Sequence, residues 1–183
     1  MKSLLLKKKN IILKLLEVED YSKKYLHWLD DKKVNKYLET RFRSNKKSDI
    51  IKFIKSNNQS KDSNLFGIFV DKVSINNHIG NIKIGPINFN HNYAYVSYFI
   101  GEKKYWGKGY ASVAVNLITS YAFNKLKLNK CLAGVYSSNK GSIKVLKKNG
   151  YINEGVLKNQ LLSGRKYEDE YVFSCFKKNF KEL

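Results

Sequence analysis

The stretch that decides the fold is Lys104-Tyr105-Trp106-Gly107-Lys108-Gly109-Tyr110-Ala111. It follows a strand-like segment that ends near Ile100 and precedes a long amphipathic segment, residues 109–126. The two glycines let the backbone turn tightly, so several amides at the start of the following helix can point at one anion. The stretch lacks the third glycine of a dinucleotide-binding fingerprint and the Gly-Lys-Ser/Thr of a P-loop. We expect a loop that binds a pyrophosphate, although the glycines alone would equally fit a simple turn into a packed helix.

A second motif strengthens this interpretation. It is Tyr136-Ser137-Ser138-Asn139-Lys140-Gly141-Ser142-Ile143, which leads into a helix-like segment that ends at Gly150-Tyr151. At this spacing the two motifs resemble those of the GNAT superfamily of acyl-CoA N-acyltransferases. The resemblance is strongest to the branch of ribosomal-protein N-terminal acetyltransferases, spermidine acetyltransferases and related sugar-cluster acetyltransferases, and it spans nearly the whole chain.

Alternating strand and helix patterns predict a mixed α/β (α+β) protein. The predicted strands are residues 11–16, 65–70, 79–87, 93–100, 130–136, 151–157 and 170–176, and the predicted helices are residues 21–29, 49–56, 109–126 and 139–149. Asp20 is the expected N-cap of the first helix, and Pro86 is expected at an edge or a bulge. With the resemblance, this implies the GNAT fold in a single domain, residues 1–183, with about seven strands splayed at the acetyl-CoA site and about four helices.

The resemblance implies that acetyl-CoA is the cosubstrate and that no metal takes part. The end of the fourth predicted strand would offer backbone groups to the pantetheine and the thioester, and the amides of residues 106–111 would hold the pyrophosphate. Asn139 would bond the pantetheine arm while it caps its helix. The predicted coenzyme-binding residues are Phe99, Ile100, Gly101, Lys104, Tyr105, Trp106, Gly107, Lys108, Gly109, Tyr110, Ala111, Asn139 and Ser142.

Acetyl transfer to an amine requires a deprotonated amine and a proton for the departing thiolate. The resemblance makes Ser142 the expected proton donor, since Leu146 stands where some family members keep a tyrosine. The glutamate that many relatives carry early in the fourth strand is replaced by Tyr95, so the base stays open between Tyr95 and Glu102, directly or through water. Asp169, Glu170, His78 and His91 are further candidates for the base, although such residues, like Glu102, are more often found at the surface than in catalysis.

The arginines suggest the acceptor. Arg41, Arg43 and Arg165 are the only three, and all lie in loops expected on the acceptor side, together with Tyr37. Because arginine suits bidentate binding of phosphate or carboxylate, we expect an anionic small-molecule amine, first an amino-sugar nucleotide, bound by Tyr37, Arg41 and Arg165. The alternative is an acidic protein N-terminus of the ribosomal-protein type. A polyamine is disfavoured, because acidic residues do not cluster in the sequence.

The net charge of the chain does not decide which partners the protein binds. Lys+Arg number 35 against 15 Asp+Glu, which gives a net charge of +20. The lysines are spread along the chain, so compositional drift and a selected basic surface are equally compatible with it. A basic nucleic-acid-binding module with aromatics such as Tyr93 and Tyr95, and a non-catalytic coenzyme A sensor, are the remote alternatives.

The remaining features favour a cytoplasmic protein without a membrane partner. Cys131 and Cys175 lie in apolar strand-like runs and are expected to be reduced and buried. Lysines interrupt the apolar runs near the N-terminus, and no other segment approaches the length of a membrane span. The resemblance is compatible with a homodimer.

Overall fold

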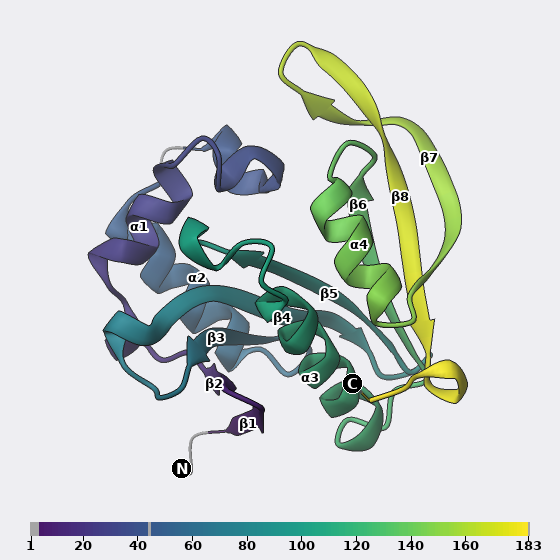
Figure 1. Cartoon of the computed structure of the whole chain (residues 1–183), viewed down its shortest axis with the longest axis horizontal. Coiled ribbons are helices and arrows are strands. Elements are labelled where there is room, and N and C mark those ends of the chain that lie inside the picture. Colours follow the sequence, from purple (N-terminus) through teal and green to yellow (C-terminus); the bar gives the residue numbers. More distant parts are fainter. Residues whose placement is uncertain (1–3, 44, 183) are drawn as a thin grey trace.

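One mixed sheet runs through the molecule, with helices on both of its faces (Figure 1). The computed structural model describes residues 4–43 and 45–182; residues 1–3, 44 and 183 of the predicted single domain lie outside this part. Within it the sheet has eight strands in the order β1-β2-β3-β4-β5-β6-β8-β7. The predicted α/β fold with a mixed sheet is confirmed.

The strands and helices follow the predicted order. The strands are β1 (Leu5–Lys8), β2 (Ile11–Leu15), β3 (Asn64–Val70), β4 (His78–Asn88), β5 (Tyr93–Ile100), β6 (Lys130–Tyr136), β7 (Ile152–Ser163) and β8 (Lys166–Phe176). The helices are α1 (Lys23–Asp30), α2 (Lys47–Gln59), α3 (Tyr110–Asn124) and α4 (Lys140–Lys148). A first apolar cluster packs the sheet against α3 and α4, and a second packs it against α1 and α2. None of the described helices is long and apolar enough to span a membrane.

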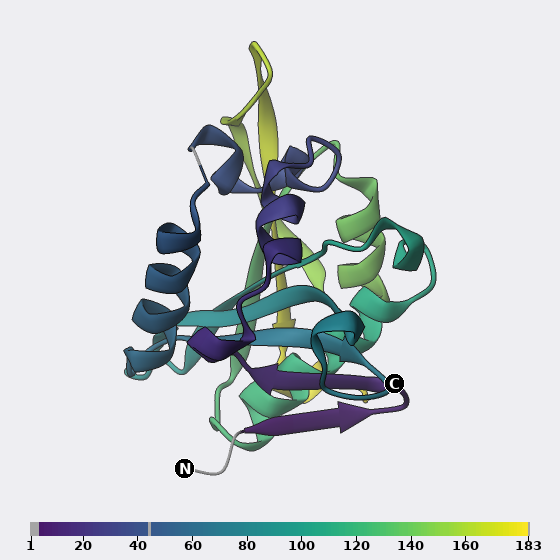
Figure 2. The same cartoon turned by 90° about the vertical axis from the view of Figure 1, so that its left-hand side faces the viewer.

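Two strand segments exceed the sequence prediction. β1 pairs antiparallel with β2, although its lysines hid the strand pattern. The β7–β8 hairpin is longer than predicted and turns at Gly164, whose φ is +65°. Figure 2 shows this hairpin rising above the rest of the sheet. Its register shifts between Leu157 and Leu161, which breaks the simple alternation that identifies a strand in a sequence.

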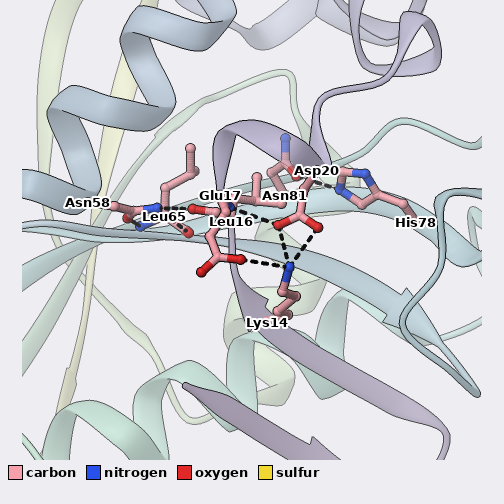
Figure 3. A network of polar contacts seen from close by, with 8 residues as sticks. All are labelled: Lys14, Leu16, Glu17, Asp20, Asn58, Leu65, His78 and Asn81. Atoms are coloured by element: carbon pink, nitrogen blue, oxygen red, sulfur yellow. Dashed lines mark hydrogen bonds and ion pairs between the residues drawn. The ribbon is translucent and has the colours of Figure 1, made fainter. Parts of the chain in front are cut away.

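The start of α1 corrects one prediction. Ser22, not Asp20, is the N-cap, and its side chain accepts a hydrogen bond from the Tyr25 amide at 3.4 Å. Asp20 instead closes a short 3-10 turn by accepting from the Glu17 amide at 2.8 Å, and it pairs with Lys14 at 2.6 Å (Figure 3). A cation on β2 therefore draws the aspartate away from the helix.

Pro86 lies at a bulge, as predicted. The β4–β5 register shifts between Ile84 and Ile87, and the Ile87 amide donates to the carbonyl of Asp62 at 2.7 Å, outside the ladder. Proline has no amide to donate, so this interruption of the ladder leaves no broken hydrogen bond behind.

The central strands β5 and β6 part soon after they meet. They run parallel and pair only from Tyr93 to Tyr95 on β5, opposite residues 130–132 on β6. Beyond Tyr95, β5 keeps its antiparallel partner β4, while β6 continues beside β8 (Figure 1). The predicted splay of the sheet is confirmed.

A buried histidine lies in the second apolar cluster. His78 is 1% exposed and its ring stacks on Phe69 at 4.7 Å between centroids. Nε2 lies 2.8 Å from Asn81 Oδ1, drawn in Figure 3, and 3.0 Å from the Gly80 carbonyl, so this nitrogen carries the hydrogen. The pKa of His78 is lowered to about 4, chiefly by burial and also by the positive charge of Lys24. The two hydrogen bonds and Asp20 act in the opposite direction.

His78 should make the fold sensitive to acid. Its folded-state pKa of about 4 lies below its usual value of 6.5, so the unfolded chain binds more protons between these values. The contribution of the uncharged His78 to stability is therefore complete above pH 6.5 and is lost as the pH falls toward 4. We expect the free energy of unfolding of the His78→Gln variant to vary less over this range, by about 3 kcal/mol. Urea unfolding at several pH values measures this, with the exposed His91→Gln as control; parallel curves for His78→Gln and the wild type would contradict it.

Candidate active site

The loop between β5 and α3 presents free amides at the start of the helix. Gly107 and Gly109 have φ of +73° and +86°, and Gly109 is the N-cap of α3. A Cβ at either glycine would meet no atom within 4 Å, so the space beside the loop is open. The amides of the first turn have no acceptor within the helix. Together with the helix dipole, this arrangement fits the phosphates of a coenzyme.

Aromatic side chains fix this loop. The rings of Tyr105 and Tyr110 meet edge to face at 5.0 Å and pack against the core. Trp106 is 42% exposed, and its indole Nε1 donates to the Ile100 carbonyl at 2.7 Å. That carbonyl is one of the groups predicted to bind pantetheine, so the indole lies on the predicted coenzyme path.

A second set of contacts ties the loop to α1. The Trp28 ring lies against Gly101, where a Cβ would come within 2.0 Å of it, and the indole donates to Glu102 at 3.2 Å. Lys24 pairs with Glu102 at 3.2 Å, and Lys103 pairs with Asp31. The carboxylate of Glu102 is therefore bound to two α1 side chains. The catalytic role of Glu102 stays a prediction, and the contacts of its carboxylate hold the loop against α1.

A hydroxyl pair joins β5 to α4 across the splay. Ser142 Oγ donates to the Tyr98 hydroxyl at 2.9 Å, and that hydroxyl donates to the Ser142 carbonyl at 3.3 Å. Burial raises the pKa of Tyr98 well above its usual value. The Tyr98 hydroxyl therefore keeps its proton at neutral pH. Asn139 caps α4 by accepting from the Ser142 amide at 3.1 Å, as predicted.

Tyr95 belongs to an open surface on the α1/α2 side of the sheet. We call this surface the open face and define it by Tyr95, Ser97, Gly134 and Glu170; Tyr136 lies on the same side of the sheet but is buried. Tyr95 is 43% exposed, and Ser97 and Gly134 are exposed as well. Tyr95 also lines a depression at the β4–β5 hairpin, with Pro86, Ile87, Asn88, Phe89, Asn90 and Tyr93. It lies at the other end of β5 from the coenzyme loop.

Tyr136 connects the predicted acceptor residues. Its hydroxyl accepts from Arg41 at 2.7 Å and donates to Glu39 at 3.1 Å, and its ring lies 5.5 Å from that of Tyr37. Arg41 also donates to the Leu162 carbonyl at 2.6 Å. Both terminal nitrogens of Arg41 are therefore bound to protein, because the other one donates to the carbonyls of residues 36 and 38.

Of the other predicted arginines, Arg165 lies exposed at the tip of the β7–β8 hairpin, three residues beyond the Leu162 carbonyl that Arg41 binds. Sequence analysis missed the roles of Tyr98 and Tyr136. Tyr98 alternates with Val96 and Ile100 on the core side of β5, and a buried tyrosine hydroxyl requires a partner; this signal was present in the sequence.

The match to known families decides the assignment. Residues 10–152 match the model of the Acetyltransferase (GNAT) domain family. The chain belongs to the GNAT acetyltransferase family. The resemblance inferred from the two motifs is therefore confirmed, and with it the expectation of an acetyl-CoA-dependent N-acetyltransferase.

Individual relatives extend over almost the whole GNAT chain. It is 30% identical over 172 residues to the "Uncharacterized N-acetyltransferase p20" of Bacillus licheniformis, covering 93% of this chain and 94% of that one. The crystal structure of a GNAT-family acetyltransferase from Bacillus anthracis superposes with a TM-score of 0.80 at 23% identity, over 96% of this chain and 99% of that one. The structure of spermidine N-acetyltransferase from Vibrio cholerae, in complex with CoA and spermine, has a TM-score of 0.80 at 19% identity, over 94% and 98% of the two chains. At these identities the structures show the shared fold alone.

The described residues include no group of three or more His, Cys, Asp or Glu side chains placed to hold a metal ion. The cysteines Cys131 and Cys175 are buried and free, as expected.

Trp106 provides an optical test of the predicted coenzyme site. Coenzyme A should change the emission of its exposed indole, because pantetheine would displace it from the Ile100 carbonyl. The other tryptophan, Trp28, is 4% exposed and should hardly respond. The Trp106→Phe variant should lose the change. Unaltered wild-type emission at a coenzyme concentration that calorimetry shows to saturate the protein would contradict this placement.

Proposed function

We propose that this GNAT protein transfers the acetyl group of acetyl-CoA directly to a primary amine, and that the amine belongs to a nucleotide-linked amino sugar. The observation that carries the proposal is the parting of β5 and β6 after Tyr95, with the first turn of α3 on one side and the Tyr98–Ser142 pair across it. This arrangement offers a place for the thioester between an anion-binding helix end and a proton donor.

The coenzyme part rests on the glycine loop. The amides of residues 106–111 would bind the pyrophosphate, and Lys104 and Lys108 would add positive charge beside it. The backbone of residues 99–101 would position the thioester. Asn139 would accept a further hydrogen bond or donate one through its amide nitrogen, because only its oxygen is used in the helix cap.

The catalytic part rests on the hydroxyl pair. Ser142 would protonate the departing thiolate, and Tyr98 would orient the Ser142 hydroxyl through their 2.9 Å hydrogen bond. Glu102 and Tyr95 are the bases suggested by the sequence. Glu102 is bound to Lys24 and Trp28. Among the described residues, the Tyr95 side chain has a ring contact with Tyr93 but no hydrogen bond or ion pair.

The acceptor part rests on Arg165. This side chain is exposed and has no hydrogen bond or ion pair within the part of the chain that the structure describes. It is therefore free to bind an anionic group such as the diphosphate of a sugar nucleotide. Arg41 supports this preference less than the sequence suggested, since its guanidinium already bonds Tyr136 and the hairpin. The second candidate, an acidic protein N-terminus, is favoured by the net charge of +20.

One argument against a polyamine is weakened. Acidic residues do not cluster in the sequence, yet the fold places Glu39 near enough to Glu170 to affect its titration. A polyamine therefore belongs among the acceptors tested. The cytoplasmic location, the homodimer and the single domain spanning residues 1–183 stay predictions; one sheet built from both ends of the described chain supports the last of these.

Thiol release from acetyl-CoA tests the proposal. The acceptors are a UDP-linked 4-amino sugar, a peptide with an acidic ribosomal-protein N-terminus, and spermidine. We expect turnover with the sugar nucleotide and a large loss in Asn139→Ala, while the exposed Asn124→Ala, at the far end of α3, keeps wild-type activity. Release with the peptide or spermidine alone would overturn the acceptor, and no release with any amine would overturn the proposed function.

Ser142→Ala tests the proton donor. Loss of a general acid should lower kcat by about 100-fold, with little change in the KM for acetyl-CoA. Ser142→Thr keeps a hydroxyl and should retain part of the rate, and Tyr98→Phe should fall between the two. Equal kcat values in Ser142→Ala and the wild type would show that the thiolate takes its proton elsewhere.

A further inference from the structure

Glu170 stands apart from the other carboxylates of this basic protein. It is partly buried, yet it has no hydrogen bond and no ion pair within the described residues. The other partly buried acidic residues of that part all have such a partner: Asp20, Asp31, Glu102, Glu168 and Asp169. A carboxylate that loses water without gaining a partner is costly unless a ligand completes it.

The position of Glu170 is set by the β6–β8 pairing. It lies directly opposite Tyr136, and Gly134 is two residues further along β6 on the same face. A Cβ on Gly134 would lie 1.9 Å from Glu170 Oε1, so the carboxylate rests on the bare backbone of that glycine. Phe173 and Cys175 belong to the core beneath α3 and α4, and alternation along β8 therefore turns Glu170 to the open face.

This position adjoins the predicted transfer site. Tyr136 immediately precedes the turn to Asn139 and α4, and the Ser137 amide donates to the Asp169 carbonyl beside Glu170 at 3.0 Å. The groups around Glu170 are Tyr136 itself, Glu39, and Arg41, which binds the same tyrosine hydroxyl. Burial raises the pKa of Glu170, and the negative charge of Glu39 raises it further.

We propose that Glu170 binds the ammonium group of the acceptor on the open face and takes its proton before acetyl transfer. The inference rests on the proposed function and names a base for it. Glu39, which accepts a hydrogen bond from the Tyr136 hydroxyl, adds a second negative charge that favours a cationic amino group. The acceptor would reach the thioester from the α1/α2 side of the sheet.

The protons balance in the proposed sequence. The ammonium gives one proton to Glu170, and the neutral nitrogen attacks the thioester carbon. The new C–N bond forms and the C–S bond breaks. The second proton passes from the nitrogen to the Ser142–Tyr98 hydroxyls as they deliver one to the sulfur, and Glu170 returns its proton to water. The sum is amide, coenzyme A with a free thiol, and one released proton.

A binding measurement tests the ammonium site without turnover. Protein labelled with 13C at glutamate carboxyl carbons is titrated with n-butylammonium chloride in the presence of coenzyme A and followed by NMR. The resonance that Glu170→Gln removes should shift, whereas tetramethylammonium chloride, which has the same charge but no N–H, should shift it much less. No shift, or equal shifts with both cations, would overturn the site.

Kinetics test the proton transfer, with the amine that wild-type protein acetylates fastest in the panel above. We expect Glu170→Gln to lower kcat/KM for the amine by about 100-fold at pH 7 and to remove the inflection that the titration of Glu170 gives the wild-type pH profile. Glu170→Asp should recover part of the rate. Glu154→Gln removes the same charge from an ion pair between β7 and Lys130 of β6 and should match the wild type.

Gly134→Ala moves the carboxylate without removing it. The added Cβ would displace the flexible end of the Glu170 side chain, so kcat/KM should fall while the thermal midpoint stays near that of the wild type. Wild-type turnover in Glu170→Gln would overturn the proposal and leave the acetyltransferase function intact. Absence of turnover in the wild type, with the ammonium shift present, would overturn the function and leave the site.

Discussion

β5 and β6 are joined by only three register pairs, and they part after Tyr95. Beyond that point each strand keeps the partner on its other edge, β4 for β5 and β8 for β6, while the backbone groups that face the divergence have no strand partner. The sheet itself divides the core, with one apolar cluster beneath α3 and α4 and another beneath α1 and α2. The functional groups gather where the two strands diverge.

The two sides of the sheet then have different chemistry. On the α3/α4 side, the free amides of α3 and the Tyr98–Ser142 hydroxyls face the divergence, and they suit an anionic coenzyme and a departing thiolate. On the α1/α2 side, Glu170 and Glu39 suit a cationic amine. In the proposed reaction each reactant would therefore approach from its own face of the sheet.

Local patterns in the sequence predicted the local parts of the structure. The cap residue Asn139 and the periodic apolar positions after it placed α4 within one residue, and the two glycines placed the coenzyme loop. Contacts between distant segments were not visible. In the sequence nothing distinguishes Arg41 from a free arginine in a polar loop, because only the fold brings Tyr136 and the hairpin into contact with it. Glu39 and Glu170 do not form an acidic cluster in the sequence, because 130 residues lie between them; the fold brings their charges together.

Arg41 has a mechanical consequence. It joins the segment after α1 to the β7–β8 hairpin on the far side of the divergence, through the Leu162 carbonyl. The segment after α1 and the hairpin are therefore joined through the sheet at their base and by the Arg41 guanidinium near their far end. Widening the gap between these two segments requires Arg41 to release charge-assisted hydrogen bonds, so the guanidinium restricts their relative motion. The spacing between the coenzyme side and the hairpin is thus set before either reactant arrives.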